Sequence, residues 1–271
     1  MDIATARRLH DVVEPCHSFI YFATEGKIAY GEAGLKGQWM GYFASRSAPM
    51  GAVGAEVVIA TFYGFAPEMV HRAIPDAWAL ASPEIVLQAR LAVADQALRR
   101  TWGDLADGPE VAEAAALMRA AVESAECAGR PLGAAHQALA WPDEPHLAVW
   151  HGASVLREHR GDGHVATLVA HELDPRASLM TIAAVNPSYG DFVRGFRGWT
   201  PEELDETLDD LRARGLVDGE GLATDACRML RDGIEQDTDR LAVQPYRALG
   251  AEGCERLIAA LTPLAAAIKG G

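Results

Sequence analysis

Apolar side chains recur every three or four positions along most of the chain, the spacing that gathers them on one face of an α-helix. Residues 2–24 show this period first, and glycines then space out a connection at 26–37. Further helices are predicted at 38–47, 55–63, 67–74, 83–102, 110–128, 144–160, 164–173, 175–185, 201–214, 222–242 and 251–268. Alternation of apolar and polar positions, the mark of a half-buried strand, is almost absent. The pattern therefore predicts a mainly α fold with only a short wing of β structure.

The order of these elements indicates two lobes. The charged stretch 104–110 contains Gly108 and Pro109 and is the best candidate for a boundary. We therefore expect an N-terminal helical lobe at 1–106 and a C-terminal helical lobe at 107–271. Both halves contain a long helix, a polar turn, short helices and a second long helix, which favours a duplicated helix-turn-helix unit.

The segment from Thr200 to Gly221 has the outline of a recognition helix followed by a wing. Thr200 is a suitable N-cap, and Glu203 completes a capping box three residues later. Gly215 supplies a helix stop, and Gly219 and Gly221 form a tight tip. We expect the whole winged-helix module to occupy about residues 188–245.

The charge of this segment is opposite to that of a DNA-reading helix. Between Thr200 and Gly221 there are eight acidic residues and two arginines, and the chain of 271 residues has a formal net charge of −14. A helix in the major groove must approach phosphates, and Lys and Arg supply its affinity. We therefore expect no nucleic-acid partner for this segment.

The densest polar cluster contains His159, Asp162 and His164, with Arg160 among them. Glycines at 161–163 predict a chain break there, so that His159 and His164 converge and Asp162 caps the helix that carries His164. Three interpretations stay open. The cluster is an acid/base or anion-binding pocket in which Arg160 holds a carboxylate or phosphate, a metal site on the two histidines and Asp162, or a charged surface turn.

A second cluster places Arg46 among the aromatic residues Trp39, Tyr42 and Tyr63. Aromatic walls with one fixed cation suit an acidic, ring-bearing organic ligand. The competing interpretation is that these rings form the core of the domain and that Arg46 pairs with Glu56. The sequence gives no reason to prefer either.

Cofactor, location and assembly are weakly determined. A metal ion or a haem is the candidate cofactor, but the adjacent Cys16 and His17 point in different directions on a helix, so we expect Cys16 to be a buried apolar residue. The four cysteines form no CxxC motif, and no apolar run is long enough for a signal peptide or a membrane span. We expect a cytoplasmic protein with reduced thiols and no membrane partner. The oligomeric state stays open, with a homodimer as one option.

Residues 199–249 resemble the DNA-binding core of the multiple-antibiotic-resistance regulator family, the MarR-type winged helix. The matching stretches are WTPEELDETLDDLRARGLV and, after the wing, LATDACRMLRDGIEQDTDRLA. The wing lacks the arginine that such proteins carry at its tip. The whole chain also resembles a group of actinobacterial helix-turn-helix-like proteins, through WMGYFASRSAPMGAVGAEVVIATFYGF at 39–65 and LREHRGDGHVATLV at 156–169. These resemblances imply a fold and bring no settled chemistry.

Together, these observations favour a protein that binds a small organic molecule, with an acidic one as the best candidate, on a degenerate winged-helix scaffold. Arg46, Tyr63, His159 and His164 are the favoured pocket groups. An enzyme would use the two histidines with Asp162 for acid/base chemistry, or for chemistry linked to a metal or haem. The alternative is a MarR-like, ligand-responsive transcriptional regulator.

Overall fold

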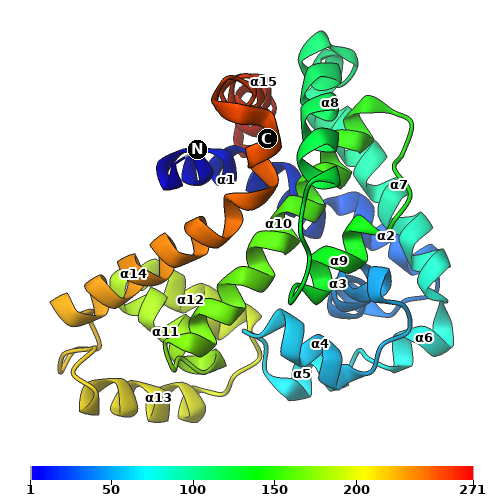
Figure 1. Cartoon of the computed structure of the whole chain (residues 1–271). Helices are drawn as coiled ribbons and strands as arrows, with labels where there is room; N and C mark the ends of the chain where they lie inside the picture. The colour runs from blue at the N-terminus through cyan, green and yellow to red at the C-terminus, as the bar shows by residue number, and fades with distance from the viewer. Residues whose placement is uncertain (1, 271) are drawn as a thin grey trace.

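The computed structural model describes residues 2–270, and helices make up nearly all of its regular structure (Figure 1). In chain order the helices are α1 (Ile3–Ser18), α2 (Thr24–Glu32), α3 (Gly37–Ser47), α4 (Ala55–Phe62), α5 (Pro67–His71), α6 (Asp76–Leu80), α7 (Pro83–Trp102), α8 (Pro109–Glu123), α9 (Pro131–Gln137), α10 (Pro145–Ala170), α11 (Pro175–Val185), α12 (Pro187–Phe196), α13 (Pro201–Ala213), α14 (Asp225–Ala242) and α15 (Gly250–Gly270). The predicted mainly α fold is confirmed. None of the helices within residues 2–270 combines the length and the apolar character that a bilayer span requires.

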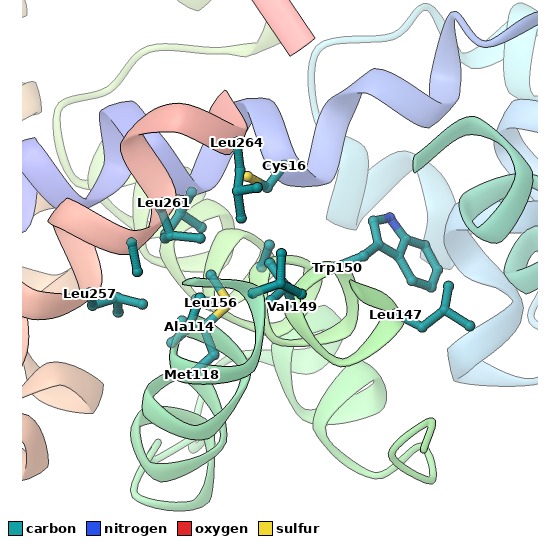
Figure 2. Packing of buried hydrophobic residues seen from close by; sticks show 14 of the residues in the cluster. Cys16, Ala114, Met118, Leu147, Val149, Trp150, Leu156, Leu257, Leu261 and Leu264 are labelled. Carbon is teal, nitrogen blue, oxygen red and sulfur yellow. The ribbon is translucent and has the colours of Figure 1, made fainter. Parts of the chain in front are cut away.

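Helix α10 runs through the middle of the molecule and packs against helices from both halves of the chain (Figure 1). Its buried side chains form the largest core together with those of α1, α7, α8 and α15. Figure 2 shows part of this core, where Cys16, Met118, Leu156 and Leu261 approach one another from four helices. Cys16 is fully buried, as its helical position predicts. Since α1 packs on both α10 and α15, the first helix is held by the C-terminal half of the chain. The lobe boundary near residue 106 stays a prediction.

Two smaller cores flank this one. The first lies among α3 to α7 and contains the fully buried Phe43 and Ile74. The second lies among α11 to α14 and contains the fully buried Leu211 and Ile234. Trp199 packs against both cores. Its indole N–H donates to the carbonyl oxygen of Gly64 at 3.2 Å. This contact attaches the C-terminal helices to the segment between α4 and α5.

The C-terminal helices form the predicted winged-helix outline. The Thr200 hydroxyl accepts from the N–H of Glu203, and the Glu203 carboxylate accepts from the N–H of Thr200, so the capping box is present. Gly215 follows α13 with a φ of +69°, the left-handed conformation that a glycine helix stop adopts at least cost. Val217 and Ala223 then form an antiparallel bridge at the base of the wing.

The predicted chain break at 161–163 is wrong, because α10 continues without interruption through these residues. The glycines serve close packing instead of a turn. A Cβ on Gly163 would lie 2.6 Å from Nη1 of Arg130, and a Cβ on Gly133 would lie 3.0 Å from Cα of His159. Glycine in a helix costs only about 1 kcal/mol relative to alanine, which the packing of α9 and Arg130 against α10 can offset.

The N-terminal elements also differ from the prediction. The first helix ends at Ser18 instead of residue 24, and the predicted connection at 26–37 contains most of helix α2. Helix α2 includes Gly26 and Gly31, which lower helix propensity, but it packs against α3 and α7. Tertiary packing therefore overrides local propensity at this point.

Candidate functional site

A cavity of about 190 Å³ lies between α3, the end of α4, α10 and α11. Residues from both polar clusters of the sequence line it together, namely Tyr42, Arg46, Tyr63, Asp162 and His164. A second cavity of about 160 Å³ shares four lining residues with the first, namely Tyr42, Phe65, Arg157 and Arg197. Trp39 lines only this second cavity. The fold thus joins residues that lie more than a hundred positions apart into one cleft beside the winged-helix module.

The floor of the cleft is a buried ion-pair network. Arg46 donates from Nε and Nη2 to the two carboxylate oxygens of Glu158, both at 2.8 Å, and Arg157 donates to the same carboxylate at 2.8 Å. Burial alone would raise the pKa of Glu158, but the charges of Arg157 and Arg46 hold it well below its usual value. The interpretation that Arg46 pairs with Glu56 is wrong, since Glu56 lies near His71 instead. The guanidinium of Arg46 also stacks on the Phe62 ring, 4.2 Å from its centroid.

Tyr63 holds the wall of the cleft that belongs to α4. It caps this helix with a φ of +57°, a conformation that non-glycine residues rarely adopt and that occurs disproportionately at functional sites. Its hydroxyl donates to the carbonyl oxygen of Leu173 at 2.5 Å, which connects α4 to the segment between α10 and α11. Tyr63 is therefore placed by contacts with two separate parts of the fold.

Asp162 acts as a capping residue, but for a helix other than the predicted one. It lies inside α10 and cannot cap the segment that carries His164. Its Oδ2 instead accepts from the backbone N–H of Gly133 at 2.8 Å, in the first turn of α9. Burial raises the pKa of Asp162 to about 6, and the nearby Glu158 charge adds to this rise. A carboxyl group in a cavity with a pKa near neutrality is typical of sites that bind ligands or transfer protons.

His159 and His164 do not converge across a turn. His159 Nε2 lies 3.2 Å from the carbonyl oxygen of Glu126, whereas His164 Nδ1 lies 2.9 Å from the hydroxyl of Thr238. Burial lowers the pKa of each to about 4, so both are neutral near pH 7. Within residues 2–270 no three His, Cys, Asp or Glu side chains are grouped closely enough to hold a metal ion. The predicted set of His159, Asp162 and His164 is thus not assembled as a metal site.

Arg160 does not line the cleft. Its Nη2 donates to Glu235 at 3.1 Å and to Asp239 at 3.0 Å, and Arg7 binds the same two carboxylates from α1. This network joins α1, α10 and α14. Arg160 therefore helps to hold these helices together, and its guanidinium does not lie where it would bind the carboxylate or phosphate of a ligand, contrary to the prediction from the sequence.

Arg197 is the functional candidate that the sequence analysis missed. Its guanidinium lies between two aromatic rings, 4.4 Å from the centroid of Phe65 and 5.0 Å from that of Phe192, and it lines both cavities. Its Nε is buried without a hydrogen-bond partner, and no carboxylate among the described residues pairs with it. The run of aromatic residues around it, from Phe192 to Trp199, was the available signal.

The surface of α13 is acidic, as the sequence predicts. Its acidic side chains that are exposed to solvent are Glu202, Asp205, Glu206, Asp209 and Asp210. Arg212, one of the two arginines, donates to Asp209 at 2.6 Å, so its charge is partly compensated within the helix. The face that would enter a DNA groove therefore carries a net negative charge.

Comparison with known proteins assigns the chain to a family. The model of a helix-turn-helix family matches residues 6–271. The chain belongs to this helix-turn-helix family. No curated protein and no solved structure matches the chain. Membership establishes the type of scaffold, and the chemistry has to be argued from the residues of the cleft.

Proposed function

We propose that this protein binds a small, acidic, ring-bearing organic molecule in the cleft between α3, α10 and α12. The observation that carries the proposal is Arg197, a cation without a carboxylate partner that is held between the rings of Phe65 and Phe192 at the junction of the two cavities. Guanidinium groups pair with carboxylates through two parallel hydrogen bonds, and aromatic walls contact a flat ligand. Arg46 is unsuited to this task because Glu158 already occupies its fork.

The protonation of Asp162 adds a pH dependence to this site. Because the pKa of Asp162 is about 6, its carboxyl group gains a negative charge as the pH rises through that value. An acidic ligand in the same cavity should therefore bind more weakly above pH 6 than below it. If the site also catalyses a reaction, Asp162 is the group that can hold and release a proton, with the neutral His164 as the second lining group.

Substitution of Arg197 tests the binding site. We expect calorimetry with a panel of polar aromatic acids, such as 4-hydroxybenzoate, to show binding to the wild type. Arg197→Met should weaken that binding by at least about tenfold, the typical loss when a hydrogen-bonded charge is removed. The affinity of the wild type should also fall between pH 5.5 and pH 7.5.

Arg194→Met is the matched control, since Arg194 lies in the last turn of α12 just before Arg197, is exposed, and lines neither cavity. It should leave the affinity unchanged. The proposal fails if no acid of the panel binds to the wild type below about 10 mM, or if the two variants weaken binding equally.

A second candidate function is a ligand-responsive transcriptional regulator. Membership of a helix-turn-helix family and the resemblance of residues 199–249 to MarR-type regulators favour it. The acidic surface of α13 opposes it, because phosphate contacts supply most of the affinity for DNA. A homodimer would suit such a regulator, and sedimentation would measure it.

We expect no sequence-selective DNA binding through residues 200–221. In a mobility-shift assay at low salt, the wild type should give no selective complex below 1 μM. Asp209→Lys combined with Asp210→Lys should raise only non-selective affinity, because contacts to phosphates carry no sequence information. A salt-sensitive, sequence-selective complex of the wild type would instead support the regulator.

A further inference from the structure

A separate cavity of about 310 Å³ lies between α7, α10 and the segment after α9. It shares no lining residue with the cleft beside the winged-helix module. Its walls are mainly hydrocarbon and indole, with Leu87 and Leu91 from α7, Trp141 from the segment after α9, and Trp150 from α10. A volume of this size accepts a ligand of about the size of a single ring.

Arg90 is the unusual residue of this cavity. Only 2% of its surface is exposed, and no carboxylate among the described residues pairs with it. Its Nε and Nη2 are buried without hydrogen-bond partners, although the guanidinium stacks on the Trp150 ring, 4.7 Å from its centroid. A buried charge without a partner is strongly unfavourable, so a protein that keeps one needs an acceptor at that place.

Two further polar atoms of the cavity are unpaired. The indole Nε1 of Trp150 and Nε2 of His151 are buried without hydrogen-bond partners. Figure 2 shows the Trp150 indole on the side of the core that lies away from Leu257. Burial, with added repulsion from Arg90 and Arg119, lowers the pKa of His151 to about 4, so its ring is neutral and carries one proton. Trp150 can only donate, and His151 donates from Nε2 in one of its neutral forms. Arg90, Trp150 and, in that form, His151 are therefore three lining residues of one cavity that each carry an N–H group without an acceptor.

Two arginines lie at or beside this cavity, although the chain as a whole is acidic. Arg119 stacks on Trp141, 4.3 Å from the ring centroid, and none of the carboxylates described in residues 2–270 forms an ion pair with it. Two cations without ion-pair partners thus act on His151, whose ring lies 4.6 Å from that of Trp141, measured between the centroids. Such a place attracts an anion.

We propose that this cavity is a binding site for a monocarboxylate with a small hydrocarbon body. The carboxylate pairs with the guanidinium of Arg90 and accepts from the Trp150 indole, and the hydrocarbon part lies against Leu87, Leu91 and Trp141. The apolar walls distinguish this site from the more polar cleft around Arg197. The apolar walls also disfavour inorganic anions. Such an anion loses its hydration on entering the cavity and has no apolar surface whose burial could offset that cost.

The probes are benzoate, cyclohexanecarboxylate and hexanoate. Their binding is measured by calorimetry and by the change in fluorescence of the two lining tryptophans. All measurements are made in the wild type and in Arg197→Met, so that binding to the other cleft is recognised. We expect at least one of the three carboxylates to bind equally in both proteins. Benzamide, the neutral analogue of benzoate, and inorganic phosphate should each bind at least about tenfold more weakly.

Arg90→Met tests the role of the buried cation. Arg100→Met is the control, because Arg100 lies on the same helix but is exposed and pairs with Glu25. Arg90→Met should weaken carboxylate binding at least about tenfold, and Arg100→Met should leave it unchanged. Without ligand, the melting temperature of Arg90→Met should equal or exceed that of the wild type, because a buried charge without a partner is removed. The proposal is overturned if none of the three carboxylates binds below about 10 mM. It is also overturned if Arg90→Met leaves the affinity unchanged or clearly lowers the melting temperature.

Discussion

Glu158→Ala is expected to destabilise the protein by about 3–5 kcal/mol, the typical effect of removing one partner of a buried ion pair. Glu158 is 1% exposed and accepts hydrogen bonds from Arg46 and Arg157, each at 2.8 Å. Its removal leaves the Arg46 guanidinium buried next to Phe62 without a carboxylate partner, with the Tyr42 hydroxyl as its remaining side-chain acceptor. Urea unfolding followed by circular dichroism measures the loss.

Two further variants show whether the effect comes from the unpaired charge. Glu255→Ala removes an exposed carboxylate that pairs with Arg8, and because solvent screens this pair its loss should be much smaller. The double variant Arg46→Met with Glu158→Leu should recover much of the loss, since it leaves no buried charge at that pair. If Glu158→Ala is no more harmful than Glu255→Ala, the cleft floor does not depend on the network.

The second large effect is a pH-dependent stabilisation by Asp162→Asn. The pKa of Asp162 is about 6 in the folded protein and 3.8 for an ordinary aspartate. The protonated carboxyl therefore stabilises the fold fully below about pH 4, and this contribution is lost as the pH rises to 6 and above. Asparagine keeps an oxygen that can accept from the N–H of Gly133 and carries no charge at any pH. We expect Asp162→Asn to be more stable than the wild type by roughly 3 kcal/mol at pH 7.5 and about equally stable at pH 4.

Asp162→Ala separates the charge from the hydrogen bond. It also removes the charge, but it leaves the N–H of Gly133 without its acceptor. It should be less stable than Asp162→Asn by about 1 kcal/mol at both pH values. Equal stability of the two variants would show that the contact with α9 contributes nothing. A stability difference between the wild type and Asp162→Asn that does not change between pH 4 and pH 7.5 would show that Asp162 titrates in its ordinary range, because the buried histidines contribute equally to both proteins.

The proposed role of Asp162 in ligand binding explains why the protein keeps an aspartate whose charge lowers the stability of the fold at neutral pH. Groups that serve binding or proton transfer often reduce stability, because they are held where their charge is poorly solvated. Arg90 and Arg197 fit the same description, since both have buried polar atoms without partners. These three positions are therefore the first to substitute in a functional screen.

The amino-acid sequence alone determined the features that depend on neighbouring residues. Helix periodicity, the capping box of Thr200 and Glu203, and the stop at Gly215 each involve groups within a few positions of one another. The acidic character of α13 also follows from composition, because the apolar stripe of a helix settles which side chains face solvent. These features sufficed to predict a mainly α protein with a helix-turn-helix scaffold.

Only the tertiary structure decided the partners and the protonation of the polar residues. Arg46 and Glu158 are 112 positions apart, and nothing in either local segment indicates that they meet. Helix α10 continues through 161–163, where the Arg130 guanidinium packs against Gly163, a contact that local propensity does not contain. The pKa values of His164 and Asp162 move in opposite directions because burial disfavours the charged form of each, which is the cation of histidine and the anion of aspartate. Burial and distant partners are properties of the packed molecule, so the group that titrates near neutrality could be identified only there.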